Sequence, residues 1–177
     1  MTQEEYKSLK ELLLKDLCAR LPYGVIGQCE IDASYDTSFE TKPQTHKFNA
    51  EVYGLLEEGL LFVTPLIEDQ DVQEFANEEV ADGVDILDFK PYLFPLSSLT
   101  EEMMEELNTE GFFKYDNTIA NISYLKSKNG ISKEIYTYVD IESASILIEF
   151  FNSHHIDYRG LIEKGLAIDA TGLNIYC

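Results

Sequence analysis

The sequence contains no tryptophan and only three cysteines. It has only 13 basic residues against 33 acidic ones, which gives a formal net charge of −20 at pH 7. Because affinity for a nucleic acid backbone comes mostly from basic side chains that release counterions, we expect no direct binding to nucleic acid. The longest unbroken apolar runs, such as Leu60–Val63, are far too short to span a bilayer. Residues 1–21 also lack the long apolar segment and cleavage site of a signal peptide. We therefore expect a cytoplasmic protein that does not bind membranes.

The three cysteines are Cys18, Cys29 and Cys177, and no two of them have the spacing of a metal-binding or redox motif. Cys18 falls in an apolar stripe with helical spacing and Cys29 lies beside an expected strand, where a cysteine behaves as a small hydrophobic residue. We expect these thiols to be reduced and structural, with Cys177 as the exposed one.

Motifs of common enzyme classes are missing as well. The phosphate-binding loop, the Rossmann fingerprint, the nucleophile elbow and the HExxH zinc motif have no match in the chain. The sequence therefore predicts no catalytic residue, no metal site and no cofactor, and it favours a non-enzymatic protein over an enzyme.

The length and the apolar content predict one globular domain over residues 1–177, because 177 residues with 45% hydrophobic side chains can bury a core without metals or disulfides. Thr2 and Glu5 form a capping-box pattern, and apolar residues recur at helical spacing from Tyr6 to Leu17. The expected helices cover residues 3–20, 100–108, 141–151 and 161–166, with Thr100 and Asp140 as the caps of the second and third. The expected strands cover 24–31, 48–56, 60–64, 84–89, 131–139 and 173–176.

These elements predict an α+β fold with a mainly antiparallel sheet of two hairpins plus extra strands. The N-terminal helix and two to three further helices are expected to pack against it. One hairpin turns at Glu58-Gly59 and the other at Asn129-Gly130, a pair that suits a type I′ turn. Residues 67–82 are acidic and lack clean periodicity, so we expect an exposed loop insertion there.

Three segments resemble a known group of sequences: Leu12–Ile26 (LLLKDLCARLPYGVI), Lys90–Glu102 (KPYLFPLSSLTEE) and Asp157–Ala170 (DYRGLIEKGLAIDA). Together they are similar to an uncharacterised family of small proteins from gut bacteroidete bacteria, their prophages and mobile elements. One departure is Phe94, where a basic residue is more usual in that family. The resemblance implies a bacterial host cytoplasm or a phage setting, and it implies no activity, cofactor or site residue.

Acidic residues concentrate between Ile67 and Glu110, where 14 of them accompany a single lysine. Such a surface can steer a basic protein partner, or imitate the charge of DNA and block a nucleic-acid enzyme. A solvated face that only keeps the protein soluble explains the same pattern, and a divalent-cation loop fits it less well because Glu74 stands where an EF-hand needs glycine. The candidate partner-binding residues are Glu68, Asp69, Asp71, Glu74, Glu101, Glu102, Glu105 and Glu106.

A second candidate site follows the helix expected over 141–151. Its residues are His154, His155, Asp157 and Arg159, which together could bind a phosphate group. The competing explanation is structural, because histidines near a helix C-terminus can satisfy its last carbonyl groups, and Asp157 can pair with Arg159 or cap the next helix.

These observations lead to one main hypothesis for the function and two alternatives. The main hypothesis is a non-enzymatic phage or mobile-element accessory protein that binds a basic protein partner through its acidic surface and inhibits a host defence or nucleic-acid enzyme. The first alternative is a protein that binds or sequesters a small molecule such as a nucleotide. The second is that the acidic surface serves solubility alone and the function lies elsewhere.

Overall fold

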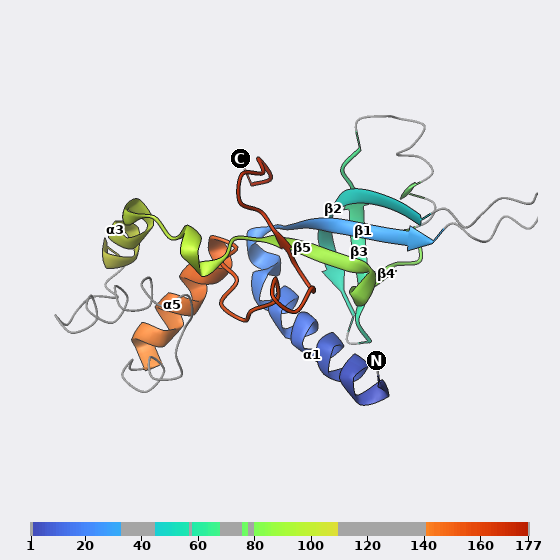
Figure 1. Cartoon of the computed structure of the whole chain (residues 1–177), viewed down its shortest axis with the longest axis horizontal. Coiled ribbons are helices and arrows are strands. Elements are labelled where there is room, and N and C mark those ends of the chain that lie inside the picture. Colours follow the sequence, from blue (N-terminus) through green and yellow to red (C-terminus); the bar gives the residue numbers. More distant parts are fainter. Residues whose placement is uncertain are drawn as a thin grey trace, which may run out of the picture. The chain divides into compact units, whose positions relative to one another are not determined.

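The structure is a computed structural model that describes residues 2–32, 45–56, 58–67, 76–77, 80–109 and 141–176 (Figure 1). The described residues form two compact units. Unit 1 comprises those up to Tyr92 together with 161–168 and 174–176, and unit 2 comprises those within 93–160 and 169–173. The expectation that the whole chain is one domain stays a prediction.

The N-terminal helix α1 (Gln3–Arg20) begins with the predicted capping box. The Thr2 hydroxyl accepts a hydrogen bond from the Glu5 amide at 3.2 Å, and the Glu5 carboxylate accepts one from the Thr2 amide at 2.7 Å. Two of the free amides at the helix start are thereby satisfied. The 3-10 turn η1 (Leu21–Tyr23) continues α1 up to Gly24, whose φ is +73°. The predicted N-terminal helix is confirmed.

The face that α1 buries is rotated from the predicted one. Leu13, Asp16, Leu17 and Arg20 are buried, whereas Tyr6 is 39% exposed. The predicted stripe took in Tyr6 because apolar residues recur there at helical spacing. The observed face follows the i, i+3, i+4, i+7 pattern through two charged positions instead, because Asp16 and Arg20 form an ion pair that lets both be buried.

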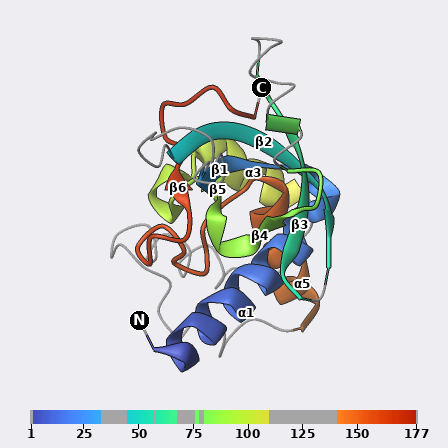
Figure 2. The same ribbon diagram turned by 90° about the vertical axis from the view of Figure 1, so that its right-hand side faces the viewer.

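Unit 1 is built on a curled six-stranded sheet, which is mostly antiparallel. Figures 1 and 2 show α1 on one side of this sheet, and an ion pair of 2.7 Å between Lys10 Nζ and Asp85 Oδ2 joins the helix to β4. The spatial order is β4-β3-β2-β1-β5-β6, with β1 (Val25–Asp32), β2 (Thr45–Leu55), β3 (Leu60–Pro65), β4 (Val84–Asp85), β5 (Phe89–Leu93) and β6 (Ile168–Asp169).

Alternate residues of the three long strands supply the core of unit 1. The β2–β3 hairpin has the predicted turn, and a β-bulge at Val52/Gly54 shifts its register. Successive strand residues point to opposite faces, so one face collects the apolar side chains. The buried side chains of this core include Val25, Cys29, Ala50, Val52, Leu61 and Val63 of these strands and Leu13 and Leu17 of α1.

The strand predicted over 84–89 is wrong in its bounds. It divides into β4 and β5, separated by the 3-10 turn η2 (Ile86–Asp88), because the Asp85 carboxylate accepts a hydrogen bond from the Leu87 amide at 3.0 Å and caps that turn. The second strand also continues through Pro91, which stands opposite Gly27 on β1. Proline is tolerated at a position that donates no hydrogen bond to the neighbouring strand.

Two predicted elements near the end of the chain are also wrong. Residues 161–166 form turns rather than a helix, and Gly165 closes them with a φ of +70°. Residues 173–176 form no strand; the sheet ends at β6 on one side and at β4 on the other. In 161–166 the Gly165 and Leu166 amides donate to the Ile162 and Leu161 carbonyls, which closes turns rather than a helix. Near the end of the chain, the Tyr176 hydroxyl bonds to β1 and β5 instead of its own segment pairing as a strand.

Unit 2 has a core of its own that α3 (Glu101–Thr109) and α5 (Ile141–Ser153) supply. The Thr100 hydroxyl accepts a hydrogen bond from the Met103 amide at 3.2 Å, as the capping prediction requires. Partly buried hydrophobic residues such as Phe94 and Met103 pack around the core. The buried centre of this cluster consists of Leu107, Phe150, Phe151 and Ile156.

The predicted α+β class with a mainly antiparallel sheet is confirmed. The hairpin predicted at Asn129-Gly130 and the cap predicted at Asp140 lie outside the described residues. Within the part of the chain that the structure describes, no helix combines the length and apolar content needed to cross a membrane.

Candidate functional site

The acidic residues predicted to bind a partner fall into two groups. Glu68, Asp69, Asp71 and Glu74 lie outside the described residues. The other four carboxylates lie on α3 of unit 2, and all of them are exposed: Glu101, Glu102, Glu105 and Glu106. Glu101 and Glu102 occupy the first turn, where the helix dipole favours negative charge.

Glu106 has a second role within unit 2. Its Oε2 lies 3.3 Å from His154 Nε2, so it joins α3 to the end of α5. On its other side the His154 ring lies 4.2 Å from the Phe150 ring, measured between centroids, and its Nδ1 lies 3.0 Å from the Phe150 carbonyl oxygen. Both ring nitrogens of His154 therefore contact protein groups.

His155 lies two residues after Ser153, the last residue of α5, and its φ of +53° is in the left-handed region. Its amide donates to the Asn152 carbonyl at 3.2 Å, and the Ile156 amide donates to the Phe151 carbonyl at 2.8 Å. This pair of bonds is the Schellman motif, in which glycine usually holds the position of His155. The structural explanation for the two histidines thus has direct support, since both contribute to the end of the helix.

The remaining members of this segment are held by packing and by the backbone. The Phe94 amide donates to the His155 carbonyl at 2.9 Å and the buried Asp157 amide donates to the Phe94 carbonyl at 2.7 Å, which forms a parallel bridge. Tyr158 stacks on Phe151 at 5.6 Å between ring centroids, and its hydroxyl donates to Asn152 Oδ1 at 3.1 Å.

Arg159 contacts the same aromatic cluster. Its guanidinium carbon lies 4.9 Å from the centre of the Tyr158 ring, which is a cation–π distance. The four candidate ligand residues therefore lie on one loop, and that loop is part of the packing of unit 2. Their arrangement supports the structural explanation better than a phosphate site.

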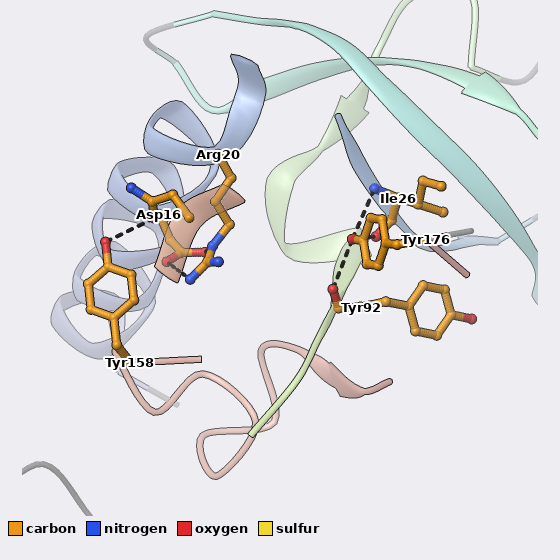
Figure 3. A network of polar contacts seen from close by, with 7 residues as sticks. Asp16, Arg20, Ile26, Tyr92, Tyr158 and Tyr176 are labelled. Atoms are coloured by element: carbon orange, nitrogen blue, oxygen red, sulfur yellow. Dashed lines mark hydrogen bonds and ion pairs between the residues drawn. The ribbon is translucent and has the colours of Figure 1, made fainter. Parts of the chain in front are cut away.

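Sequence reasoning missed the most deeply buried polar group of unit 1, the ion pair of Asp16 and Arg20 (Figure 3). Arg20 Nε donates to Asp16 Oδ2 at 2.8 Å and Nη2 donates to Oδ1 at 3.1 Å, with both side chains fully buried. Because the fork of the guanidinium matches both carboxylate oxygens, the pair keeps its charges compensated inside the protein. Its signal was present in the sequence: two opposite charges four residues apart on the buried face of a helix.

A second polar cluster of unit 1 surrounds the hydroxyl of Tyr176 (Figure 3). This oxygen lies 3.1 Å from the Ile26 carbonyl oxygen, 2.9 Å from the Tyr92 carbonyl oxygen and 3.3 Å from the Ile26 amide nitrogen. Burial raises the pKa of the Tyr176 phenol to about 12, although the hydrogen bond with the backbone of Ile26 opposes that shift. The hydroxyl therefore keeps its proton at neutral pH.

The two described cysteines differ in accessibility. Cys29 is buried in β1, and burial, followed by the charge of Asp88, raises the pKa of its thiol to about 12. Cys18 is exposed, which corrects the prediction that Cys177 alone is exposed. The reason is the rotated face of α1, which turns Cys18 away from the core. Within the described ranges, no three histidine, cysteine, aspartate or glutamate side chains gather so that they could hold a metal ion.

Comparisons with known protein families, with curated proteins and with solved structures find no significant match to the chain. The resemblance noted from the sequence therefore stays an expectation.

Proposed function

We propose that this chain is a non-enzymatic accessory protein of a phage or mobile element that binds a basic protein partner through an acidic surface. The observation that carries the proposal is α3, on which four carboxylates are exposed and which contains no basic residue. On the other side of the helix, Leu107 is buried and Met103 packs against the core of unit 2. The carboxylates are therefore presented by a helix anchored in a core, rather than by a loose tail.

Charge supports the proposal in a second way. A net charge of −20 attracts positively charged surfaces and speeds their association, particularly at low salt. Enzymes that bind nucleic acids present such surfaces, because they must neutralise phosphates. Together with the family resemblance, this favours a host defence or nucleic-acid enzyme as the partner and its inhibition as the result.

The test uses a variant in which Glu101, Glu102, Glu105 and Glu106 are all replaced by glutamine. The proteins that it captures from host lysate are quantified against the wild type at about 0.05 M and about 0.5 M salt, since screening weakens exposed charge interactions. A matched control carries the same change of charge on exposed positions of unit 1, namely Glu4, Glu51, Glu58 and Glu163 replaced by glutamine.

We expect a basic protein to be captured at low salt by the wild type and by the control, and to be lost from the α3 variant. Equal capture by both variants would show that only the total charge matters and would refute a binding role for α3. Capture of no basic protein by the wild type would leave the acidic surface with a solubility role alone.

The alternative function, nucleotide binding through the segment from His154 to Arg159, has a separate test. Titration of the wild type with nucleotides should leave its melting temperature unchanged, because this segment is engaged in the packing of unit 2. Arg159→Ala should lower the melting temperature with or without nucleotide. Stabilisation of the wild type that disappears in a variant of unchanged stability would establish the alternative instead.

A further inference from the structure

The ladder between β1 and β5 ends at Pro91, one residue before Tyr92, where the chain leaves unit 1. Its pairs are Cys29–Phe89, Gln28–Lys90 and Gly27–Pro91. Continuing this register by one residue would place Ile26 opposite Tyr92. In an antiparallel ladder, hydrogen-bonded and non-hydrogen-bonded pairs alternate. Since Pro91 has no amide hydrogen, the next pair is the one that should exchange backbone hydrogen bonds.

The hydroxyl of Tyr176 occupies that position. It accepts from the Ile26 amide at 3.3 Å and donates to the Tyr92 carbonyl oxygen at 2.9 Å, the two groups that would otherwise bond to each other. A hydroxyl has a single hydrogen, so it cannot donate at the same time to the Ile26 carbonyl oxygen, 3.1 Å away. Like a bridging water molecule, the hydroxyl links the Ile26 amide to the Tyr92 carbonyl oxygen and prevents these two groups from bonding directly.

We propose that Tyr176 is a removable wedge in the β1–β5 ladder, and that its withdrawal lets Ile26 and Tyr92 pair directly. This end of the sheet then has two arrangements, and each gives the Ile26 amide an acceptor and the Tyr92 carbonyl a donor. Burial keeps the phenol protonated at neutral pH, so the inserted group is a hydrogen-bond donor throughout the physiological range.

The wedge lies beside the point where the chain leaves unit 1. Tyr92 is the last residue of unit 1 before the chain enters unit 2 at Leu93, and residue 174 is where it returns to unit 1 for the last time. By its position, the Tyr176 hydroxyl therefore ends the β1–β5 ladder just before the chain leaves unit 1.

The experiment compares two substitutions by hydrogen exchange of backbone amides in the full chain. Tyr176→Phe keeps the ring but removes the hydroxyl, so the Ile26 amide loses its acceptor while the strands stay apart. We expect its exchange to become about five- to tenfold faster, as the loss of one net hydrogen bond implies. Tyr176→Ala removes the ring too, and we expect the Ile26 amide to regain the protection it has in the wild type.

Direct pairing in Tyr176→Ala is detected by a scalar coupling through the hydrogen bond from the Ile26 nitrogen to the Tyr92 carbonyl carbon. The matched control is Tyr92→Phe, which also removes one tyrosine hydroxyl, the donor to Asn49 Oδ1 at 2.8 Å, but keeps the Tyr92 carbonyl. In this control the exchange of Ile26 should not change.

Three results would overturn the proposal. Unchanged exchange of Ile26 in Tyr176→Phe would show that the hydroxyl is no bridge. Fast exchange of Ile26 without the coupling in Tyr176→Ala would show that the strands do not close. An equal rise in exchange at Ala50 and Val52 on β2 in both variants would show that Tyr176 merely supports the whole sheet.

Discussion

The two units of this chain bury polar groups in opposite ways. Unit 1 hides a complete ion pair, in which Asp16 and Arg20 satisfy each other within one helix. Unit 2 buries Asn152, His155 and Asp157 at the end of α5, where backbone groups and the Tyr158 hydroxyl are among their partners. The difference follows from position: a buried helix face offers no free backbone groups, whereas a helix end leaves several carbonyls without partners. Charges in the first setting must come in pairs, whereas polar residues in the second can bond to the backbone of the helix end.

The largest effect expected is in unit 1, for Arg20→Ala. The substitution leaves the Asp16 carboxylate buried without its partner, which should lower the free energy of unfolding by about 3–5 kcal/mol. Replacing both residues by leucine should cost far less, because no charge is left uncompensated. Urea denaturation of the two variants measures both values. An Arg20→Ala protein as stable as the double variant would show that the pair is not desolvated as the structure indicates.

Gly27→Ala tests how closely β1 and β5 pack against each other in the sheet of unit 1. A methyl group at this position would collide with the Phe89 ring and the Lys90 carbonyl oxygen on β5. Since a backbone atom cannot move aside as a side chain end can, we expect a loss of about 1–3 kcal/mol by denaturant unfolding. Gly172→Ala in unit 2 is a control for added volume alone, because a side chain there meets no atom within 4 Å, although its positive φ carries a cost of its own. Gly27→Ala as stable as the wild type would mean that β1 and β5 are less closely packed.

Cys29, on β1 of unit 1, makes the stability of the protein depend on pH. In the unfolded chain its thiol ionises near its ordinary pKa of 9.0, whereas burial raises the pKa in the folded protein to about 12. Above pH 9 the unfolded state therefore binds fewer protons than the folded one, and stability falls as the pH rises. The Cys29 contribution to that fall is about 1.4 kcal/mol per pH unit between these values.

Cys29→Ala should remove this contribution to the slope between pH 9 and 10, whatever it does to stability at pH 7. Chemical unfolding at several pH values measures the slope. The same slope in Cys29→Ala and in the wild type would contradict the buried, protonated thiol. In a thiol-reagent assay on the folded protein, Cys18 should react and Cys29 should not, because Cys18 is the exposed one of these two.

In unit 2, the Schellman motif at the end of α5 is tested at His155. A residue other than glycine pays a steric cost in the left-handed region that His155 occupies, and glycine does not. His155→Gly should therefore be more stable than His155→Ala by about 1 kcal/mol in thermal or chemical unfolding, since both lack the imidazole. Equal stability would show that the backbone at His155 does not adopt this conformation.

The smallest effect is expected for Glu106→Gln, which breaks the exposed contact of 3.3 Å with His154. Half of the Glu106 side chain is exposed, so the interaction should be worth only about 0.2–1 kcal/mol and should weaken further at high salt. Comparison with Arg20→Ala by the same unfolding assay completes the contrast between the units. A loss of unfolding free energy as large as that expected for Arg20→Ala would show that the His154–Glu106 contact is far less hydrated than the exposure of Glu106 indicates.

Local signals explain which elements were predicted correctly. The capping box at Thr2 and Glu5, the hydroxyl cap at Thr100 and the alternating residues of β2 and β3 act over three to four residues or along one strand. Where the decisive contact is distant in sequence, the prediction was wrong. The last residues were predicted to form a strand because of their composition, but the Tyr176 hydroxyl bonds to Ile26, 150 residues away.

The segment from His154 to Arg159 is a second case in which contacts distant in sequence decided the structure. Its residue types permitted both a phosphate site and a helix end, and no spacing rule separates these. The bond from the His155 amide to Asn152 and the bridge of Phe94 with Ile156 favour the helix end. The second of these contacts joins segments about 60 residues apart, which no pattern within the loop could reveal.

By itself, the sequence determined the net charge, the α+β class and the starts of α1 and α3, because these depend on composition and on contacts between near neighbours. Only the tertiary structure decided which face of α1 is buried, where β5 ends and what the histidines contact. The physical reason is that burial depends on the partner that each group finds. Asp16 can be buried because Arg20 lies beside it, and beyond the Gly27–Pro91 pair the Ile26 amide and the Tyr92 carbonyl bond to the Tyr176 hydroxyl.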